Sequence, residues 1–185
     1  SADMVVTHPK KVFRAPAAII FDTDNTLYAY DAPHAKATAA TEAKAVRLLG
    51  ADPESVRRAF AQAREEVKQQ LGATASSHSR LLYFQRGIEI LGRKTQLLIT
   101  LDLEQTYWRT FLSHCELFAG VRDLLVNLRN RDIATAIITD LTSQIQFRKI
   151  IYFGLDDCFD YVVTSEEAGA DKPDPAPFRL AIAKL

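Results

Sequence analysis

The sequence predicts an α/β fold in which a parallel sheet is interrupted by an inserted block of helices. Three short apolar runs, at residues 17–20, 133–138 and 161–164, have the length and composition of buried strands. The second and third runs alternate with helical patterns, which is typical of a parallel sheet with right-handed crossover connections. The long segment 28–115, between the first run and the second, shows only helical patterns. We therefore expect this segment to be an insertion.

Four helices are expected within the insertion. The second has the clearest start, because Asp52 offers a capping side chain and Pro53 fits the first turn of a helix. Glycine follows three of the four patterns directly and is a natural helix stop. Leu101 and Trp108 are the expected packing positions of the fourth helix. The expected helices cover residues 35–49, 53–71, 80–91 and 95–112.

The second half of the chain is expected to complete the sheet and to supply the helices that cover it. These helices are predicted at residues 120–129, 142–153 and 176–185. The first residues include the basic stretch H-P-K-K without a long apolar segment beside it, which does not indicate a signal peptide. The predicted organisation is an N-terminal extension at residues 1–16, a discontinuous α/β core at residues 17–27 and 116–185, and a helical cap at residues 28–115.

Two carboxylates stand two residues apart where the first predicted strand should end. Asp22 and Asp24 lie in the stretch F-D-T-D-N-T-L, directly after the apolar run A-A-I-I. Residues i and i+2 of a strand face the same side, and open α/β sheets bind ligands at the carboxyl ends of their strands. One carboxylate can therefore attack a substrate while the other transfers a proton.

This pattern resembles the first motif of the haloacid dehalogenase-like (HAD) hydrolases. Two further segments resemble later motifs of that superfamily, in the same order. The run A-T-A-I-I-T-D ends in Thr139, a hydroxyl residue at a strand end, and the segment G-A-D-K-P-D-P contains Lys172. The resemblance implies a Rossmann-like core with a helical cap of the C1 type, and it covers nearly the whole chain.

The resemblance also implies roles for individual residues. Asp22 would be the nucleophile that forms an aspartyl-phosphate, and Asp24 would be the general acid and base. Thr139 would bind a phosphoryl oxygen, and Lys172 would neutralise negative charge between nucleophile and phosphate. Mg²⁺ would be held by the side chain of Asp22 and the backbone carbonyl of Asp24, since this ion prefers oxygen ligands.

A second set of residues is predicted to contact the substrate. Asn25 follows the two carboxylates, and Asp140 follows Thr139, where it would either cap the next helix or lie near the phosphate. The cap of this superfamily usually sets substrate choice, and its polar segment S-S-H-S-R contains His78 and Arg80. Arg86 is a further candidate, although a solvated helix start is the simpler interpretation of these cap residues.

The chemistry predicted from these motifs is phosphate ester hydrolysis. An acidic residue at Asp24 favours phosphatases over haloacid dehalogenases, because a halide leaves without a proton. The expected substrate is a small phosphorylated metabolite, either a nucleoside monophosphate or a sugar phosphate. A phosphosugar mutase of the same superfamily is an alternative. The family's acidic fourth motif, of the type G-D-x-x-x-D, has no counterpart up to Leu185. The chain is therefore expected to be C-terminally incomplete, and a non-catalytic binding domain is a further alternative.

Composition narrows the choice of partners. Lys plus Arg and Asp plus Glu both number 23, so the formal net charge of zero gives no reason to expect a nucleic acid or a membrane partner. The two cysteines, Cys115 and Cys158, have no metal-binding spacing and indicate packed thiols in a reducing compartment such as the cytoplasm. An incomplete core would expose a sheet edge and apolar helix faces, which favours a homodimer.

Overall fold

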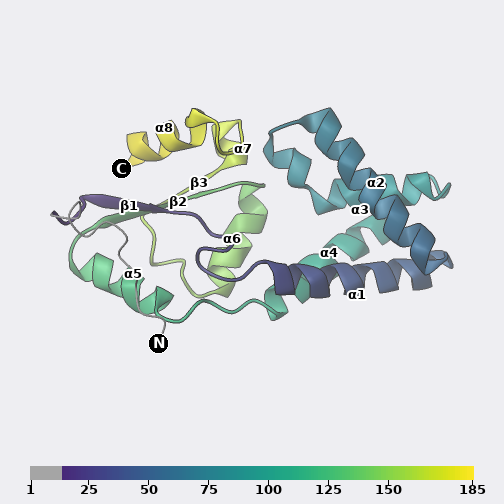
Figure 1. The fold of residues 1–185 in the computed structure, drawn as a ribbon, viewed down its shortest axis with the longest axis horizontal. Helices are drawn as coiled ribbons and strands as arrows, with labels where there is room; N and C mark the ends of the chain where they lie inside the picture. Colours follow the sequence, from purple (N-terminus) through teal and green to yellow (C-terminus); the bar gives the residue numbers. More distant parts are fainter. Residues whose placement is uncertain (1–13) are drawn as a thin grey trace.

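A computed structural model describes residues 14–185 and confirms the α/β fold (Figure 1). Its sheet has three parallel strands in the order β1-β2-β3, with β1 at Ala18–Phe21, β2 at Ala134–Thr139 and β3 at Tyr161–Thr164. All three strands lie where apolar runs predicted them. Of the predicted N-terminal extension, residues 1–13 lie outside the described part.

Helices cover both faces of this sheet (Figure 1). Successive residues of β2 point to opposite faces, as the pleat of a strand requires. Ile137 packs in a cluster with Leu125 and Ile150, whereas Ile138 packs with Val163 and Ala181. The helices of this half are α5 (Val121–Asn130), α6 (Ser143–Tyr152), the short α7 (Ser165–Ala168) and α8 (Pro175–Lys184).

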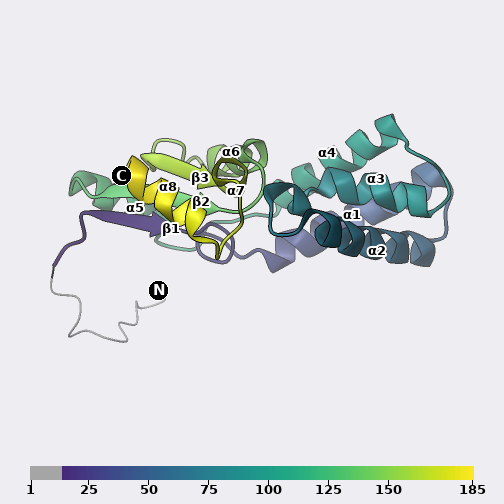
Figure 2. The same ribbon diagram turned by 90° about the horizontal axis from the view of Figure 1, so that it is seen from above.

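The inserted segment forms a separate block of four helices beside the sheet (Figures 1 and 2). Helix α1 packs along α4, and α2 packs along α3. The predicted start of α2 is confirmed, because the side chain of Asp52 accepts a hydrogen bond of 2.9 Å from the backbone amide of Ser55. The elements are α1 (Asp31–Leu49), α2 (Pro53–Leu71), the 3₁₀ turn η2 (Ala75–His78), α3 (Arg80–Ile90) and α4 (Leu97–Ser113).

Two burial predictions were wrong. Strand β1 was expected to be buried, but it lies at one end of the strand order and Ile20 is 37% exposed. Leu101 was expected to pack, but it is 50% exposed, whereas Trp108 is buried at 5% exposure. The buried face of α4 runs through Leu103, Tyr107 and other residues at helical spacing, and Leu101 lies outside that stripe.

A continuous apolar core joins the helical block to the sheet. Tyr28 has no exposed surface and lies just before α1, in the connection from β1. Its ring contacts that of Phe111 in α4 and that of Phe153 at the end of α6, with centroid separations of 6.0 and 5.2 Å. Buried residues of both halves, including Leu103 and Ile145, belong to the same cluster. The two halves therefore share one core at the connection.

The two cysteines are free thiols, as the sequence predicts. Cys115 is buried where α4 leads back to the core, and Cys158 is half-buried. Burial raises the pKa of the Cys115 thiol to about 11, so this thiol is protonated at neutral pH.

Gly87 lies at the contact between α2 and α3. A Cβ added there would overlap the ring of Phe60, which is itself buried. We expect Gly87→Ala to lower the free energy of unfolding by about 1–3 kcal/mol, because the added methyl group overpacks the core. Urea unfolding of both proteins measures this difference. Equal or greater stability of the variant would show that Phe60 moves aside without cost.

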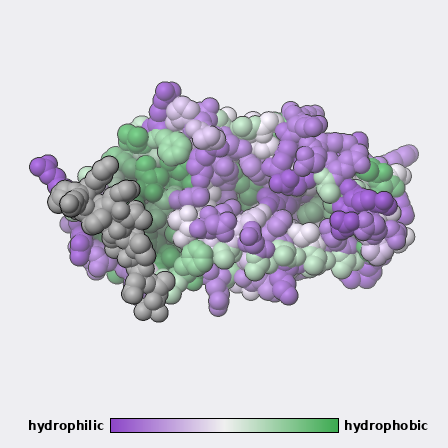
Figure 3. Space-filling view, viewed as in Figure 1, coloured by the Kyte–Doolittle hydropathy of each residue, from purple (hydrophilic) through white to green (hydrophobic). Residues whose placement is uncertain are grey.

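The sheet half and the helical block differ in the hydropathy of their surface side chains. In the face shown in Figure 3, apolar side chains gather at the sheet end of the molecule, whereas polar side chains dominate over the helical block. Exposed large apolar residues of the sheet half include Ile20, Phe178 and Ile182. The predicted homodimer stays a prediction. Among the described residues, no helix has the length and apolar character to cross a membrane.

Candidate functional site

The carboxyl ends of β1 and β2 meet at one edge of the sheet, and the predicted site lies there. Asp22 follows β1, Thr139 ends β2, and Lys172 arrives from the loop between α7 and α8. A cavity of about 220 Å³ opens at this edge. Its lining includes four predicted catalytic residues and further polar ones: Asp22, Asp24, Thr139, Lys172, Tyr30, His78, Arg80, Asp140, Gln146 and Lys149.

Asp22 is held through one carboxylate oxygen and leaves the other free. Its Oδ1 accepts hydrogen bonds from the backbone amide of Thr23 at 2.8 Å and from Nζ of Lys172 at 2.7 Å. Lys172 also donates to the carbonyl of Ile138 at 3.1 Å, which fixes the ammonium group above the end of β2. Within the described part of the chain, Oδ2 of Asp22 has no hydrogen-bond donor. The carboxylate is thus oriented with one oxygen available to a ligand.

Asp24 is held by a different pair of residues. Its Oδ1 lies 3.2 Å from Nζ of Lys149 and accepts a hydrogen bond from the hydroxyl of Tyr28. The same lysine lies 3.2 Å from the Tyr28 hydroxyl, so the three groups contact one another. Burial and the neighbouring Asp24 carboxylate raise the pKa of Tyr28 well above its usual value, which keeps this hydroxyl a donor.

Lys149 lines the cavity and is a candidate functional residue that the sequence reasoning missed. It lies on α6 with a side chain only 3% exposed, and burial lowers its pKa, although Asp24 partly offsets this. Its ammonium group lies 5.0 Å from the ring centroid of Phe111 and 5.3 Å from that of Trp108. Aromatic faces attract a cation at such distances. No local signal marks Lys149, because a lysine is an ordinary residue on an amphipathic helix.

Thr139 and Asp140 end β2 inside the cavity. The Thr139 hydroxyl lies 2.9 Å from the hydroxyl of Thr23 and 3.5 Å from the carbonyl of Asp140, to which it can also donate. Asp140 accepts a hydrogen bond of 3.0 Å from the backbone amide of Lys172 and does not cap α6, whose N-cap is Thr142. Burial raises the pKa of Asp140, opposed by that amide.

The backbone is strained directly after these two residues. Leu141 is buried and has a φ of 86°, in the left-handed region that a branched, non-glycine residue rarely adopts. Its amide donates to Oγ of Ser165 at 2.9 Å, which holds this conformation. Such strain costs about 1–3 kcal/mol and gathers at functional sites. The strain supports the view that the β2 edge is shaped for a ligand.

Asn25 lies in the turn that follows β1, directly after Asp24. It has a φ of 59°, and its side-chain oxygen accepts a hydrogen bond of 2.9 Å from the amide of Tyr30. This contact shapes the turn that leads from β1 into α1. Asn25 is not among the residues that line the cavity, and its role in substrate binding stays a prediction.

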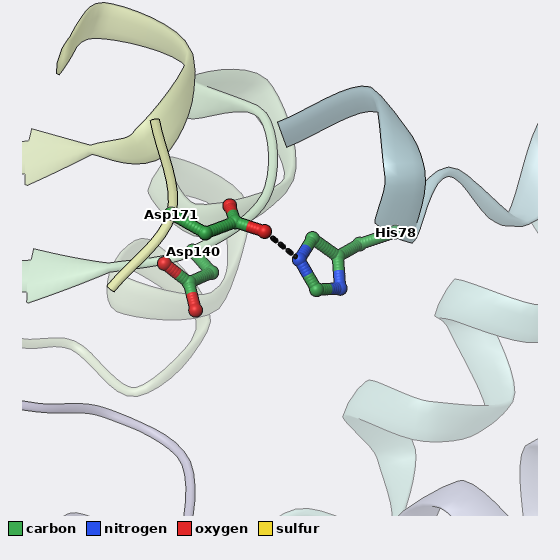
Figure 4. Close-up of side chains that lie close together, drawn as sticks. All are labelled: His78, Asp140 and Asp171. Carbon is green, nitrogen blue, oxygen red and sulfur yellow. Dashed lines mark hydrogen bonds and ion pairs between the residues drawn. The ribbon is translucent and has the colours of Figure 1, made fainter. Parts of the chain in front are cut away.

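His78 crosses from the helical block to the sheet edge (Figure 4). Its Nε2 lies 2.6 Å from Oδ2 of the buried Asp171, while its Nδ1 lies 3.3 Å from Nζ of Lys68. A neutral imidazole that donates from Nε2 and accepts at Nδ1 satisfies both contacts. A second contact joins the same segments, because the Asp171 amide donates to the carbonyl of Ala73 at 3.0 Å.

Loss of the His78 side chain should weaken this junction. The other oxygen of Asp171, Oδ1, is buried without a hydrogen-bond partner among the described residues. His78→Ala would leave the whole carboxylate unpaired, so we expect the free energy of unfolding to fall by about 1–3 kcal/mol. Urea unfolding measures the loss. In a double-mutant cycle, Asp171→Asn should make the His78→Ala change nearly neutral, and an unchanged loss would exclude this contact as its cause.

Arg80 lies at the boundary between the helical block and the site. Its guanidinium donates to the Tyr30 hydroxyl at 2.5 Å and to the carbonyl of His78 at 2.9 Å. It also lies 5.1 Å from the ring centroids of Tyr107 and Trp108. Arg86 points elsewhere and pairs with Glu66 on the exposed surface, at 2.5 Å.

Two groups of side chains could hold a metal ion. Free carboxylate oxygens at the sheet edge suit Mg²⁺, which prefers oxygen ligands, and Asp22 and Asp24 have side chains 46% and 39% exposed. This donor set fits the predicted ion. In the described part, His78, Asp140 and Asp171 also have ligand atoms within 4.8 Å of one another (Figure 4). Both ring nitrogens of His78 are already engaged, Nε2 by Asp171 and Nδ1 by Lys68, so we assign no metal to this group.

Comparison with known proteins identifies the family. The sequence model of the haloacid dehalogenase-like hydrolases matches residues 16–185. The chain belongs to this family. This match confirms the resemblance predicted from the motifs. The α/β core and the helical insertion described above are those that the resemblance implies.

Individual relatives and structures agree with this assignment. The chain is similar to a ribulose-1,5-bisphosphate 5-phosphatase of Halopiger xanaduensis, with 37% identity over 91% of this chain and 71% of the relative. It is also similar to a glyceraldehyde 3-phosphate phosphatase of Methanothermobacter thermautotrophicus, with 27% identity over 91% of this chain and 71% of that relative. A magnesium-bound HAD-hydrolase of Bacillus subtilis has the same fold, with a TM-score of 0.60 and 20% identity over 93% of this chain and 73% of that one.

Proposed function

We propose that this HAD chain is a Mg²⁺-dependent phosphatase that hydrolyses small sugar phosphates through an aspartyl-phosphate on Asp22. One observation carries the proposal: Asp22 is held by Lys172 through one oxygen and presents the other to a cavity that Asp24 also lines. The two relatives named above act, by their names, on phosphorylated sugars, which favours a sugar phosphate over a nucleoside monophosphate.

The first step would transfer the phosphoryl group to the enzyme. The free Oδ2 of Asp22 attacks phosphorus, and the bond between phosphorus and the sugar oxygen breaks. Protonated Asp24 gives its proton to that leaving oxygen, so a neutral alcohol departs. Lys172 stands beside Asp22 and offsets the negative charge that gathers there, as positioned cations do in phosphoryl transfer.

The second step would release phosphate. Asp24, now ionised, accepts a proton from a water molecule, which attacks phosphorus and breaks the bond to Asp22. The product is inorganic phosphate, and both aspartates return to their starting states. Lys149 and the Tyr28 hydroxyl hold one oxygen of Asp24, so the other can face the leaving group and later the water.

The metal site would lie on the same edge. Asp22 and the backbone carbonyl of Asp24 would hold Mg²⁺, which supplies charge neutralisation for the phosphate oxygens when bound. Thr139 or its partner Thr23 would donate a hydroxyl hydrogen bond to the phosphate. Each of these groups comes from the end of β1 or β2, so the sheet itself sets their spacing.

The test is phosphate release from glyceraldehyde 3-phosphate, ribulose 5-phosphate and adenosine monophosphate, measured with Mg²⁺ and with EDTA. We expect release from the sugar phosphates that depends on Mg²⁺ and exceeds release from the nucleotide. Phosphorus NMR of the same reactions distinguishes a mutase, which would produce an isomeric sugar phosphate without free phosphate. Folded protein that changes none of these compounds would support a non-catalytic domain and overturn the proposal.

A further inference from the structure

A second cavity lies within the helical block, next to the candidate active site. Its volume is about 360 Å³, and residues of α1, α2, α3 and α4 line it together with the η2 turn. Tyr30, His78 and Arg80 line both this cavity and the one at the sheet edge. These three residues therefore lie where the two cavities adjoin, and a ligand that occupies both would pass beside Arg80. We call this second space the cap cavity.

The cap cavity has an unusual excess of positive charge. Its lining contains the cations Arg57, Arg64, Lys68 and Arg80, and a single carboxyl group, that of Glu42. Burial raises the pKa of this carboxyl group, and the nearby charge of Arg57 opposes that effect. The chain as a whole has a net charge of zero, so the excess is local to this cavity.

Two of these cations have no carboxylate partner. Arg57 is paired with Glu54, whose Oε2 lies 3.0 Å from its Nε, and Arg64 lies 3.4 Å from Glu65 on the surface. Within residues 14–185, by contrast, Lys68 and Arg80 form no ion pair. Lys68 instead contacts an imidazole nitrogen of His78. Arg80 donates to hydroxyl and carbonyl oxygens.

The surroundings of Lys68 disfavour its positive charge. Burial lowers its pKa, and the nearby charges of Arg64 and Arg80 lower it further, against a smaller opposing effect of Asp171 and Glu65. The pKa of His34, which lines the same cavity, is lowered by burial and by the same two arginines. A dianion placed among these groups would remove this mutual repulsion and would form charge-assisted hydrogen bonds.

We propose that the cap cavity binds the second phosphate of a bisphosphorylated sugar. This inference rests on the proposed function, because the other phosphate would lie beside Asp22. Lys68 and Arg64 bind the distal phosphate, and Arg80 lies between the two anionic ends. A phosphate suits the site better than a neutral sugar end, because a multiply charged group matches a lining that contains Arg64, Lys68 and Arg80, of which Lys68 and Arg80 have no carboxylate of their own within residues 14–185. A monophosphate would fill one cavity and leave the other without its ligand.

The experiment compares binding of a bisphosphate and of a monophosphate of the same sugar. The probes are ribulose 1,5-bisphosphate, ribulose 5-phosphate and adenosine monophosphate, measured by calorimetry with the full-length protein carrying Asp22→Asn, so that hydrolysis does not interfere. We expect the bisphosphate to bind at least about tenfold more tightly than the monophosphate. Lys68→Gln and Arg64→Gln should each reduce this preference by about tenfold. Arg58→Gln is the matched control, because Arg58 lies on the same helix but is exposed and does not line the cavity.

The outcomes distinguish a failure of the distal phosphate site from a failure of the proposed phosphatase function. Equal affinity for the two sugars, or a preference that Lys68→Gln and Arg64→Gln leave unchanged, overturns the distal phosphate site even if the wild-type protein hydrolyses sugar monophosphates. Tighter binding of adenosine monophosphate than of the bisphosphate also overturns it and assigns the cap cavity to a nucleoside. If the wild-type protein hydrolyses nothing and the charge-dependent preference persists, the binding site stands and the proposed function fails.

Discussion

Replacement of Asp22 by asparagine is expected to reduce sugar phosphate hydrolysis by four orders of magnitude or more, by analogy with the loss of about 10⁴–10⁶-fold when other enzymes lose a nucleophile or its partner. The amide keeps the shape of the side chain and one oxygen, so Lys172 and the Thr23 amide retain an acceptor. The amide is a far weaker nucleophile than a carboxylate, and it cannot form a stable acyl-phosphate. The loss should appear in the turnover number, because the attack itself is removed.

The measurement is steady-state phosphate release beside thermal unfolding of the same preparations. Asp22 has a side chain that is 46% exposed, so its substitution should change stability little. Asp156→Asn is the matched control, since that carboxylate is exposed and lies away from the cavity. Activity of the Asp22 variant above one tenth of the wild-type value would exclude Asp22 as the nucleophile. Equal losses in both variants would indicate a general effect of the substitution.

Several parts of the site could be predicted because they are local features of the chain. Asp22 follows an apolar run that forms a strand, and Thr139 ends another. Lys172 lies in a distinctive short motif, G-A-D-K-P-D-P. Parallel strands bring their carboxyl ends to one edge, so strand assignment alone predicts that these side chains meet. The Lys172 to Asp22 contact of 2.7 Å, across 150 residues of sequence, follows from that topology.

Other parts could not be predicted because they depend on how the helical block sits on the sheet. Lys149 reaches Asp24 only because α6 packs beside the connection that contains Tyr28. The cap cavity requires four helices at their actual crossing angles, which helical periodicity does not specify. Leu101 illustrates the same limit within one helix, because a shift of one position moves a leucine from the buried stripe to the surface.

Lys149→Met should separate activity from stability. The side chain of Lys149 is 3% exposed, and its ammonium group is taken out of water mainly against aromatic rings and one carboxylate. Methionine fills similar volume without the desolvation cost, and Asp24 is not left buried and unpaired, because its side chain is 39% exposed and keeps the Tyr28 hydroxyl as a donor. We therefore expect the free energy of unfolding at neutral pH to rise by about 1–2 kcal/mol. Turnover should fall by about 100-fold or more, because Asp24 loses the cation that orients it for proton transfer.

The stability difference should depend on pH in a definite direction. Burial lowers the pKa of Lys149 in the folded protein below its ordinary value of 10.5. Between the lowered pKa and 10.5, the unfolded chain binds a proton that the folded protein does not, so wild-type stability rises with pH in that window. The advantage of Lys149→Met should therefore be largest below the folded-state pKa and should shrink toward 10.5. Urea unfolding at about pH 7 and about pH 9.5 tests this, below the ordinary tyrosine pKa of about 10.

Lys44→Met provides the contrast that makes this prediction specific. Lys44 pairs with Asp102 at 2.6 Å, but both side chains retain solvent contact, at 21% and 39% exposure. Loss of such a pair should cost about 0–1 kcal/mol and leave turnover unchanged. If Lys149→Met instead loses stability while keeping full turnover, the buried ammonium serves the fold and Asp24 acts without it. A gain in stability joined to a loss of turnover would mean that the molecule retains a costly buried charge because proton transfer at Asp24 requires it.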